Sequence, residues 1–327
     1  MRKANRRMQR RIAATVATGA LALAGTALAT GVANAAPATH QTSYRFVTLD
    51  NQRDVTFNQL LGINNHGEIA GYFGSGAAGH PNKGYRLYPP YGQRDYVNEN
   101  FPHSVQTQVT GLNDNGVTVG FWSSMNTASM SNSNFGFWEQ NGRYHTADFP
   151  TGDPASPPVD QLLGVNDHDV AVGFYTDGQG NNHGYEYNIR THRYSTVTDP
   201  SLPSASLTAA GINNYGNVAG IYTNAAGTTD GFLKVGHTFI DLAVPGASST
   251  MALGVNDHDE VVGTYTVGSG SSAVMHGFTW KPGHGFTTVD DPHGIGTTTI
   301  NGVNNEGDLV GFYVDSAGNT DGFLAAP

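Results

Sequence analysis

The sequence predicts an all-β fold, a six-bladed β-propeller closed by its N-terminal strand, and three observations support this prediction. A thirteen-residue unit rich in Gly, Asn and aliphatic residues recurs six times. The spacings between successive copies are 49, 53, 47, 43 and 48 residues, and this period of about 48 suits a four-stranded blade. The last copy lacks an outer strand, which an unmatched run at residues 43–50 can supply. An open solenoid is the alternative, but it would need polar capping repeats that the sequence lacks.

Each copy predicts two short strands joined by a tight turn. The copies occupy residues 61–73, 110–122, 163–175, 210–222, 253–265 and 301–313, and their leading glycines are Gly62, Gly111, Gly164, Gly211, Gly254 and Gly302. The glycines of the two strands lie nine positions apart, which centres the hairpin between the third and fourth residues of N-[ND]-x-[GD]. We therefore expect a positive φ at the fourth position, where Asp169 and Asp259 replace the Gly of the other copies.

Two further strands complete each blade. A glycine followed by an aromatic residue, such as Gly84-Tyr85 or Gly277-Phe278, marks a third strand about twenty residues after the start of each copy. A β-rich run that ends at a turn marks the fourth, at residues 143–150, 193–200, 237–246 and 285–292. No segment after Ala35 has sustained helical periodicity.

The N-terminus reads as a secretory signal peptide, residues 1–35. Six basic residues precede an uncharged Ala-rich stretch at 12–32, and Ala33-Asn34-Ala35 forms a small-x-small cleavage site. A retained membrane anchor is the alternative, but the stretch contains only three Leu, so its insertion would be weak. We expect cleavage after Ala35 and a secreted, extracellular protein whose single propeller domain spans 36–327.

Charge and cysteine content exclude several classes of function. Removing the signal leaves ten Lys and Arg against 26 Asp and Glu, so the net charge changes from -10 to -16. This balance argues against binding to nucleic acid or to anionic membranes. The chain has no Cys, which excludes disulfides, thiol nucleophiles and Cys-bearing metal sites. We expect no cofactor, no metal and a monomer.

The repeat resembles a known family. The unit G-[IVL]-N-x-x-G-x-[VIL]-[AV]-G-x-Y, followed by His-Gly-Phe and a Thr-rich strand that ends in Asp-x-Pro-Gly, is similar to the HAF repeat of predicted extracellular bacterial proteins. The triplets His183-Gly184-Tyr185 and His276-Gly277-Phe278 match the naming triplet closely, and the resemblance covers residues 43–327. It implies secretion and a repeat fold, and it carries no established catalytic residue.

Two blades share an Asp-His-Asp turn, at 167–169 and 257–259. Blades 4 and 6 likewise share the tetrapeptide DGFL, so duplication of a two-blade unit accounts for both likenesses. Blades 3 and 5 are not neighbours in a six-membered ring, and one turn offers too few ligands for Ca²⁺. The Asp-His-Asp stretches therefore read as turns.

A candidate acid-base ring precedes the Gly-aromatic pairs. Its members are Lys83, Phe135, His183, Asp230, His276 and Asp321. The alternation of imidazole and carboxylate in the last four would suit proton transfer, although neighbours at the start of third strands are expected to be too far apart for hydrogen bonding. Structural hydrogen bonding is the favoured interpretation.

A candidate ligand-binding ring ends the second strands. It comprises Tyr72, Trp122, Tyr175, Tyr222, Tyr265 and Tyr313. Core packing is the default for such residues, yet they precede variable loops such as 123–134, and 149–160 is expected on the same side. Aromatic faces with Asn, Asp and His around them would suit neutral sugars.

These features leave two functions open. The favoured one is an extracellular binding or recognition module for a glycan or surface polymer, because no single blade departs strongly from the repeat. The alternative is a secreted glycan-active hydrolase or lyase that uses His183, Asp230, His276 or Asp321. The G-x-S-x-G and H-E-x-x-H signatures are absent.

Overall fold

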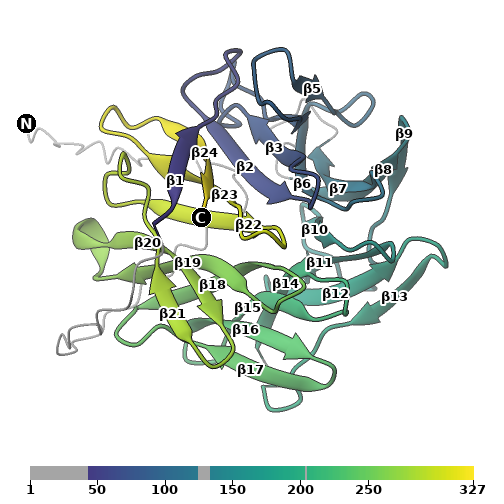
Figure 1. Ribbon diagram of the computed structural model, residues 1–327. Coiled ribbons are helices and arrows are strands. Elements are labelled where there is room, and N and C mark those ends of the chain that lie inside the picture. Colours follow the sequence, from purple (N-terminus) through teal and green to yellow (C-terminus); the bar gives the residue numbers. More distant parts are fainter. Residues whose placement is uncertain (1–42, 124–132, 203–204) are drawn as a thin grey trace, which may run out of the picture.

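The computed structural model describes residues 43–123, 133–202 and 205–327, so the predicted signal peptide lies outside the described residues, as does most of the 123–134 loop. Its six four-stranded antiparallel sheets surround one axis as the blades of a propeller (Figure 1), which confirms the predicted fold. One 3-10 turn, Gly270–Ser272, is the only helical segment of the described residues. None of these residues forms a helix long and apolar enough to cross a bilayer.

In blades 1 to 5 the strands follow the chain from the axis outward. Blade 1 contains β2 (Asn58–Ile63), β3 (Ile69–Phe73), β4 (Lys83–Leu87) and β5 (Tyr96–Asn98), and blade 2 contains β6 (Gln106–Leu112), β7 (Thr118–Ser123), β8 (Phe135–Gln140) and β9 (Arg143–Thr146). Blade 3 contains β10 (Asp160–Val165), β11 (Val170–Thr176), β12 (Asn182–Asn188) and β13 (Arg193–Thr196). Blade 4 contains β14 (Ser206–Ile212), β15 (Val218–Thr223), β16 (Thr229–Val235) and β17 (Thr238–Leu242). Blade 5 contains β18 (Ser249–Val255), β19 (Val261–Val267), β20 (Val274–Lys281) and β21 (Gly285–Thr288).

The sixth blade joins the two ends of the chain. It contains β22 (Thr298–Val303), β23 (Leu309–Val314) and β24 (Thr320–Ala326), and β1 (Arg45–Thr48) is its outer strand. β1 pairs with β24 from Arg45 opposite Ala326 to Thr48 opposite Phe323. The predicted closure by the N-terminal strand is therefore confirmed, and no blade is left three-stranded.

The inner hairpins confirm one prediction and correct another. The fourth turn residue has a positive φ in all six copies, including 58° at Asp169 and 55° at Asp259. The strand glycines, however, do not pair with each other: in blade 1, Leu60 lies opposite Gly71 and Gly62 lies opposite Ala70. The same register shift occurs in every blade. The pairs Ile63–Ile69 and Gly62–Ala70 centre the hairpin on the third turn residue, His66, and not between the third and fourth as predicted, so Gly62 does not face Gly71. A β-bulge at Leu61 then shifts the register once more beyond the leading glycine.

The leading glycines meet around the axis. A β-carbon on Gly62 would lie 3.1 Å from the Cα atom of Gly111, and equivalent contacts of 3.0 to 3.2 Å follow from blade to blade and back to Gly62. Only glycine lets six backbones approach this closely. The inner strands therefore pack directly against one another around the axis at this level.

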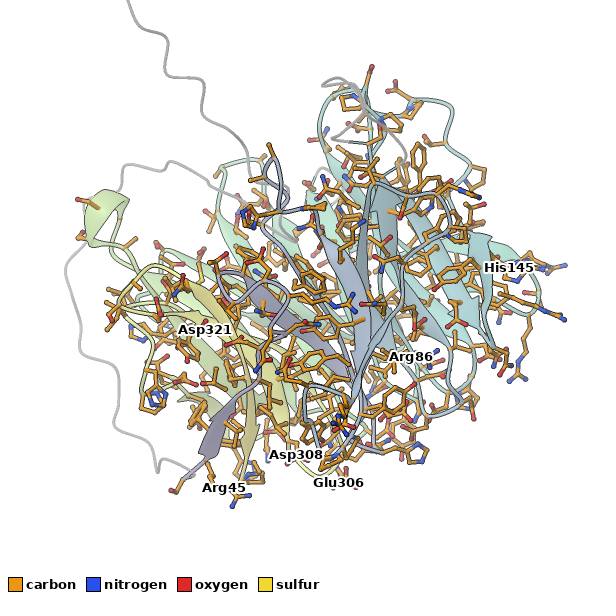
Figure 2. All side chains as sticks on the ribbon, turned by 90° about the horizontal axis from the view of Figure 1, so that it is seen from above. Arg45, Arg86, His145, Glu306, Asp308 and Asp321 are labelled. Atoms are coloured by element: carbon orange, nitrogen blue, oxygen red, sulfur yellow. The ribbon has the colours of Figure 1, made fainter. Side chains whose placement is uncertain are left out.

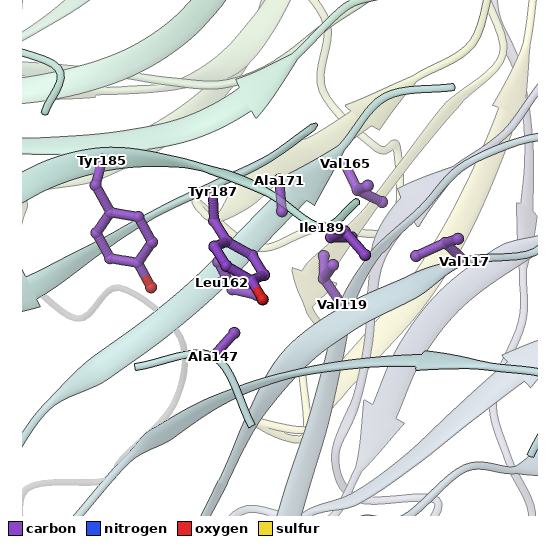
Figure 3. Close-up of a cluster of buried hydrophobic side chains, with 9 residues drawn as sticks. All are labelled: Val117, Val119, Ala147, Leu162, Val165, Ala171, Tyr185, Tyr187 and Ile189. Carbon is purple, nitrogen blue, oxygen red and sulfur yellow. The ribbon is translucent and has the colours of Figure 1, made fainter. Parts of the chain in front are cut away.

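The apolar core lies between the blades. Between blades 2 and 3, buried residues such as Val119, Leu162 and Tyr185 pack in one cluster (Figure 3). Similar clusters, each built around the aromatic residue of a Gly-aromatic pair, fill the other spaces between blades. This packing fixes neighbouring blades against each other and so fixes what they present at either end of the axis.

Candidate functional site

The propeller has two different ends. The turns between first and second strands lie at one, here called the turn end, and the loops between second and third strands lie at the other, the loop end. In Figure 2, Arg45, Glu306 and Asp308 mark the turn end, and Asp321 lies away from them. The glycine ring lies between these two ends.

The first Asn of each turn links its blade to the next one. In blade 1, Asn64 Oδ1 accepts hydrogen bonds from the backbone N–H groups of His66 and Glu68, which holds the turn. Asn64 Nδ2 donates to the carbonyl oxygen of Asn113 at 3.2 Å, and the same contact recurs at each step as far as Asn304. Asn has both a donor and an acceptor, so it can hold its own turn and the next blade together.

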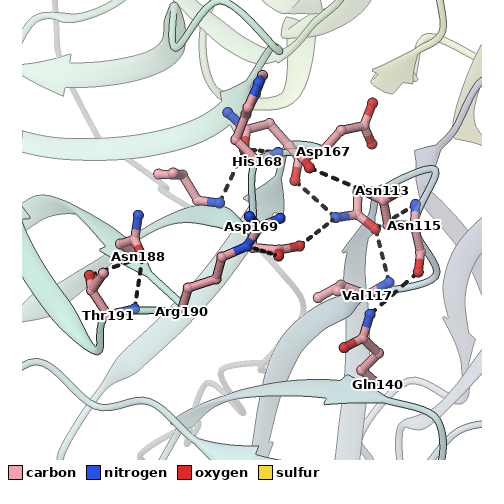
Figure 4. Close-up of polar contacts among 12 residues, drawn as sticks. Asn113, Asn115, Val117, Gln140, Asp167, His168, Asp169, Asn188, Arg190 and Thr191 are labelled. Carbon is pink, nitrogen blue, oxygen red and sulfur yellow. Dashed lines mark hydrogen bonds and ion pairs between the residues drawn. The ribbon is translucent and has the colours of Figure 1, made fainter.

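The second residue of each turn forms a closed ring of hydrogen bonds. Its members are Asn65, Asp114, Asp167, Asn214, Asp257 and Asn305. In each blade its backbone N–H donates to the Oδ1 atom of the equivalent residue in the following blade, at 2.8 to 2.9 Å, and the sixth bond returns to Asn65. Figure 4 shows the junction of blades 2 and 3, where Asp169 also joins Asn113 to Arg190. Turns from all six blades are thus locked into one polar assembly.

This assembly surrounds a pit on the axis, with a volume of about 70 Å³. Its wall consists of the first and second turn residues of every blade, and Ile63, Leu112, Val165, Ile212, Val255 and Val303 line its base. Three carboxylates, those of Asp114, Asp167 and Asp257, belong to the wall, and its lining contains no Lys, Arg or His. The pit has room for a few water molecules or one polar substituent, but less than the roughly 150 Å³ that holds a benzene-sized ring.

The third turn residues form an exposed rim around this pit. They are His66, Asn115, His168, Tyr215, His258 and Glu306. Tyr215 has 76% of its surface exposed, and no other Phe, Tyr or Trp among the described residues falls in the exposed class. Sequence reasoning treated these residues only as turns and so missed both the pit and its rim. The available signal was the restriction of the second position to Asn or Asp in all six copies.

The four predicted catalytic residues lie in separate blades at the loop end. His183 Nε2 lies 2.8 Å from Asp177 Oδ2, and His276 Nδ1 lies 2.7 Å from Asp290 Oδ2. Each imidazole therefore pairs with an aspartate of its own blade. Bonding to His183 and to turn N–H groups lowers the pKa of Asp177 well below its usual range.

The two candidate aspartates are partly or fully buried. Burial raises the pKa of Asp230, and nearby Asp241 adds to the effect. Asp321 is 8% exposed, and its pKa is likewise raised, first by burial and then by Asp315. No hydrogen bond between any two of His183, Asp230, His276 and Asp321 occurs within the described part of the chain.

Most of the six aromatic residues predicted to bind a ligand lie in the core. Tyr222 and Tyr265 are each 9% exposed and Tyr313 is 4% exposed. Trp122 and Tyr175 are half-buried beneath stacked rings, Phe101 at 4.2 Å and Phe149 at 4.7 Å between centroids. Where a ligand meets these side chains directly, it would therefore meet Trp122 or Tyr175 first.

Tyr72 does not occupy the position equivalent to the other five aromatics. In blade 3, Tyr175 pairs with Asp160 and His183, and the equivalent trio in blade 1 is Asn58, Phe73 and Lys83. Phe73 is therefore the blade 1 member. Tyr72 is fully buried on the opposite face of the strand, where its hydroxyl donates to Gln59 at 2.9 Å.

The Asp-His-Asp turns show structural roles for their aspartates. Asp167 and Asp257 belong to the closed ring of hydrogen bonds among the second turn residues. Asp259 Oδ1 accepts hydrogen bonds from Asn213 and Asn217 at 3.0 and 2.7 Å. Among the residues that the structure describes, no group of three or more His, Asp or Glu side chains is arranged to hold a metal ion.

Comparisons with known proteins assign no family to the chain. No family model matches the chain, so the resemblance to HAF repeats stays a prediction, and no curated protein matches it. Solved structures with a similar fold include virginiamycin B lyase from Staphylococcus aureus, with 10% identity, 86% and 88% of the two chains covered and a TM-score of 0.44. They also include Aleuria aurantia lectin in complex with a fucosylated sugar, with 9% identity, 81% of this chain and 91% of the lectin covered, and a TM-score of 0.47. A third is TolB from Acinetobacter baumannii, with 11% identity, 79% of this chain and 63% of TolB covered, and a TM-score of 0.49. With TM-scores below 0.5, these likenesses say nothing about what the present chain binds.

Proposed function

We propose that this protein is an extracellular recognition module that binds a glycan or glycan-like surface polymer at its turn end. One observation carries the proposal: Tyr215, the one exposed aromatic ring of the described residues, stands on the rim of the pit that all six blades build. Secretion follows from the N-terminal sequence, residues 1–35, and is part of the same proposal.

The chemistry of the turn end suits a polyhydroxylated ligand. An exposed Tyr ring can cover the apolar face of a sugar, and the carboxylate and amide oxygens of the wall can accept hydrogen bonds from its hydroxyl groups. The pit volume of about 70 Å³ matches a substituent such as a hydroxymethyl group better than a whole ring. The sugar ring would then lie over Tyr215, outside the pit.

Binding accounts for the arrangement better than catalysis does. A hydrolase needs two carboxyl groups roughly 5 to 10 Å apart on one cleft. At the loop end, His183 and His276 instead pair with Asp177 and Asp290 inside their own blades. At the turn end, the wall carboxylates are held by hydrogen bonds from neighbouring turns.

A glycan array combined with polysaccharide pull-downs tests the proposal, scoring both retention and the release of new reducing ends or unsaturated products. Tyr215→Ala removes an exposed side chain and is expected to weaken binding at least tenfold. His183→Ala, at the opposite end, is the matched control and should leave binding unchanged. Product release that His183→Ala abolishes would reject the proposal in favour of an enzyme at the loop end.

A further inference from the structure

Five basic side chains lie on the outer edge of blades 2 and 3, where the third strand turns into the fourth at the turn end. We call this group the basic patch: Arg143, His145, Arg190, His192 and Arg193. All five are exposed, and residues 141–147 and 189–198 contain no Asp or Glu. The predicted mature chain has ten Lys and Arg against 26 Asp and Glu, and three of the ten lie in these two segments. The patch is therefore a local reversal of the charge of the whole protein.

Packing between the blades places the two halves of the patch side by side. The His145 ring stacks on Trp138 at 4.0 Å between centroids, and Trp138 packs against the apolar cluster between blades 2 and 3. Tyr187 belongs to the same cluster, and its hydroxyl lies 2.8 Å from His192 Nδ1. In Figure 2, His145 lies at the outer edge of the propeller. The basic side chains of the two blades thus share one floor of aromatic residues.

Two arginines of the patch have no partner within the described residues. Arg143 lies opposite Gln140 and Arg193 lies opposite Asn188, so both begin the fourth strand at equivalent positions of neighbouring blades. Neither guanidinium group makes an ion pair or a hydrogen bond with another described side chain or backbone group. Each therefore presents its five N–H donors to solvent.

The third arginine is held in place by the turn end itself. Arg190 Nε donates to Asp169 Oδ2 at 2.6 Å, and Asp169 Oδ1 accepts from Asn113 of blade 2 at 3.4 Å (Figure 4). Asn188 Oδ1 accepts from the backbone N–H and the hydroxyl of Thr191 at 2.9 and 3.0 Å, which braces the turn. The Arg190 side chain nevertheless stays 66% exposed. A cation fixed on a braced turn loses less conformational entropy when it binds a ligand.

We propose that the basic patch binds an acidic polysaccharide, a chain whose sugars carry carboxylates. The planar guanidinium group matches a carboxylate through two parallel hydrogen bonds, and every permanent cation of the patch is Arg. Arg143 and Arg193 would each take one carboxylate of the chain. The inference goes beyond the proposed function, because it concerns the edge of the turn end and not the pit, and it shares with that function only the expectation of secretion.

The charge of the whole protein favours a single polysaccharide strand over denser polyanions. Interactions between exposed charges fade over about 8 Å at physiological ionic strength, so a narrow strand on the patch interacts chiefly with the patch. Duplex DNA is broad and carries one charge per about 1.7 Å of its axis. It would bring phosphates close to other exposed carboxylates of the same blades, such as that of Asp153. A strand with at most one carboxylate per sugar avoids this repulsion.

Binding of the secreted protein to polygalacturonate at pH 7.5 tests the patch, with neutral dextran as the control polymer. We expect retention by polygalacturonate alone, and weaker retention when NaCl is raised from about 50 to about 300 mM, because salt screens exposed charges. The double variant Arg143→Gln/Arg193→Gln should bind about tenfold more weakly. The matched control is Arg45→Gln/Arg94→Gln, which removes two exposed arginines from blades 6 and 1 and should bind as the wild-type protein does.

Loss of fold is separated from loss of binding by Tm. Arg143 and Arg193 make no side-chain bonds within the described residues, so their double variant should keep the wild-type Tm. If its Tm falls, the single variants Arg143→Gln and Arg193→Gln replace it, and each should weaken binding about threefold.

Four results would overturn the proposal. The first is absence of wild-type binding to polygalacturonate. The second is an equal loss in the two double variants, which would show that net charge and not the patch governs binding. The third is retention on duplex DNA as strong as on polygalacturonate, which would assign the patch to nucleic acid. The fourth is equal weakening by Tyr215→Ala, which would place the polymer at the pit. Since the pit is tested by Tyr215→Ala on the glycan array, each proposal can fail without the other.

Discussion

A β-carbon placed on Gly302 would lie 3.1 Å from the Cα atom of Gly62, and this contact joins the last blade to the first at the axis. The two residues are far apart in sequence, yet both begin the same repeat. The same contact recurs at every blade. The leading position is therefore glycine because the neighbouring blade leaves no space for a side chain there, and not because a local turn requires it.

Adding a methyl group to this ring should destabilise the protein. In Gly254→Ala the new β-carbon would lie 2.8 Å from the Asn301 carbonyl oxygen and 3.2 Å from the Cα atom of Gly302. Backbone would have to shift, and we expect a loss of about 1–3 kcal/mol in chemical denaturation. Gly152→Ala is the control, since nothing lies within 4 Å of its new β-carbon. Equal stability of the two variants would show that the blades do not meet as closely as described.

The repeat spacing was sufficient to predict the number of blades and the closing strand, but not the inner register. The blade count follows from six copies, and the closure follows from the orphan run at 43–50. The bulge at Leu61 could not be predicted, because an extra residue in one strand leaves the glycine spacing unchanged while shifting the pairing.

The candidate site was harder to predict, for two reasons. The bonds from Asn65 to Asp114 and onward join residues about one blade apart, and a local turn motif does not reveal such contacts. Tyr72 was misassigned because blade 1 has two adjacent aromatics. Counting from the second-strand glycine resolves this, since Phe73 follows Gly71 by two residues as Trp122 follows Gly120.

The first turn Asn should be essential to stability. Asn213→Ala would remove the acceptor for the N–H groups of Tyr215 and Asn217, and the donor to the Asn256 carbonyl oxygen. Since Asn213 is 3% exposed, water cannot readily replace it, and we expect a loss of about 2–4 kcal/mol in urea denaturation. His258→Ala, at an exposed third position, should change stability by less than about 0.5 kcal/mol. Similar effects from both variants would contradict the inter-blade role of Asn213.

The closing strand offers a matched pair of neighbours. Phe46 packs against Phe323 with 5.4 Å between ring centroids, whereas the adjacent Val47 is 45% exposed. Phe46→Ala should lower stability by about 2–3 kcal/mol and Val47→Ala by less than about 1 kcal/mol. Deletion of residues 36–50 should lower Tm sharply, since it exposes the edge of β24. An unchanged Tm after this deletion would reject the closure of the ring by β1.

The last prediction concerns pH. Burial raises the pKa of Asp160 to about 7, against hydrogen bonds from the Tyr185 hydroxyl and the Phe149 N–H that favour its ionised form. Above about pH 4 the unfolded chain loses this proton while the folded protein keeps it. The Asp160 carboxyl therefore contributes its full stabilisation below the pKa that it has in the unfolded chain. This contribution is lost as pH rises to about 7, and the free energy of unfolding falls by at most about 1.4 kcal/mol per pH unit.

Thermal unfolding between pH 5 and pH 8 should therefore show Tm falling with pH, and Asp160→Asn should reduce that slope. Asp50, whose pKa burial also raises to about 7, contributes in the same direction, so part of the slope is expected to remain in the variant. Asp177→Asn serves as the control: the pKa of Asp177 is lowered, so its contribution is lost only in strong acid and its variant should keep the wild-type slope above pH 5. A slope that is identical in Asp160→Asn and the wild-type protein would show that the Asp160 carboxyl is already ionised at pH 5 in the folded state.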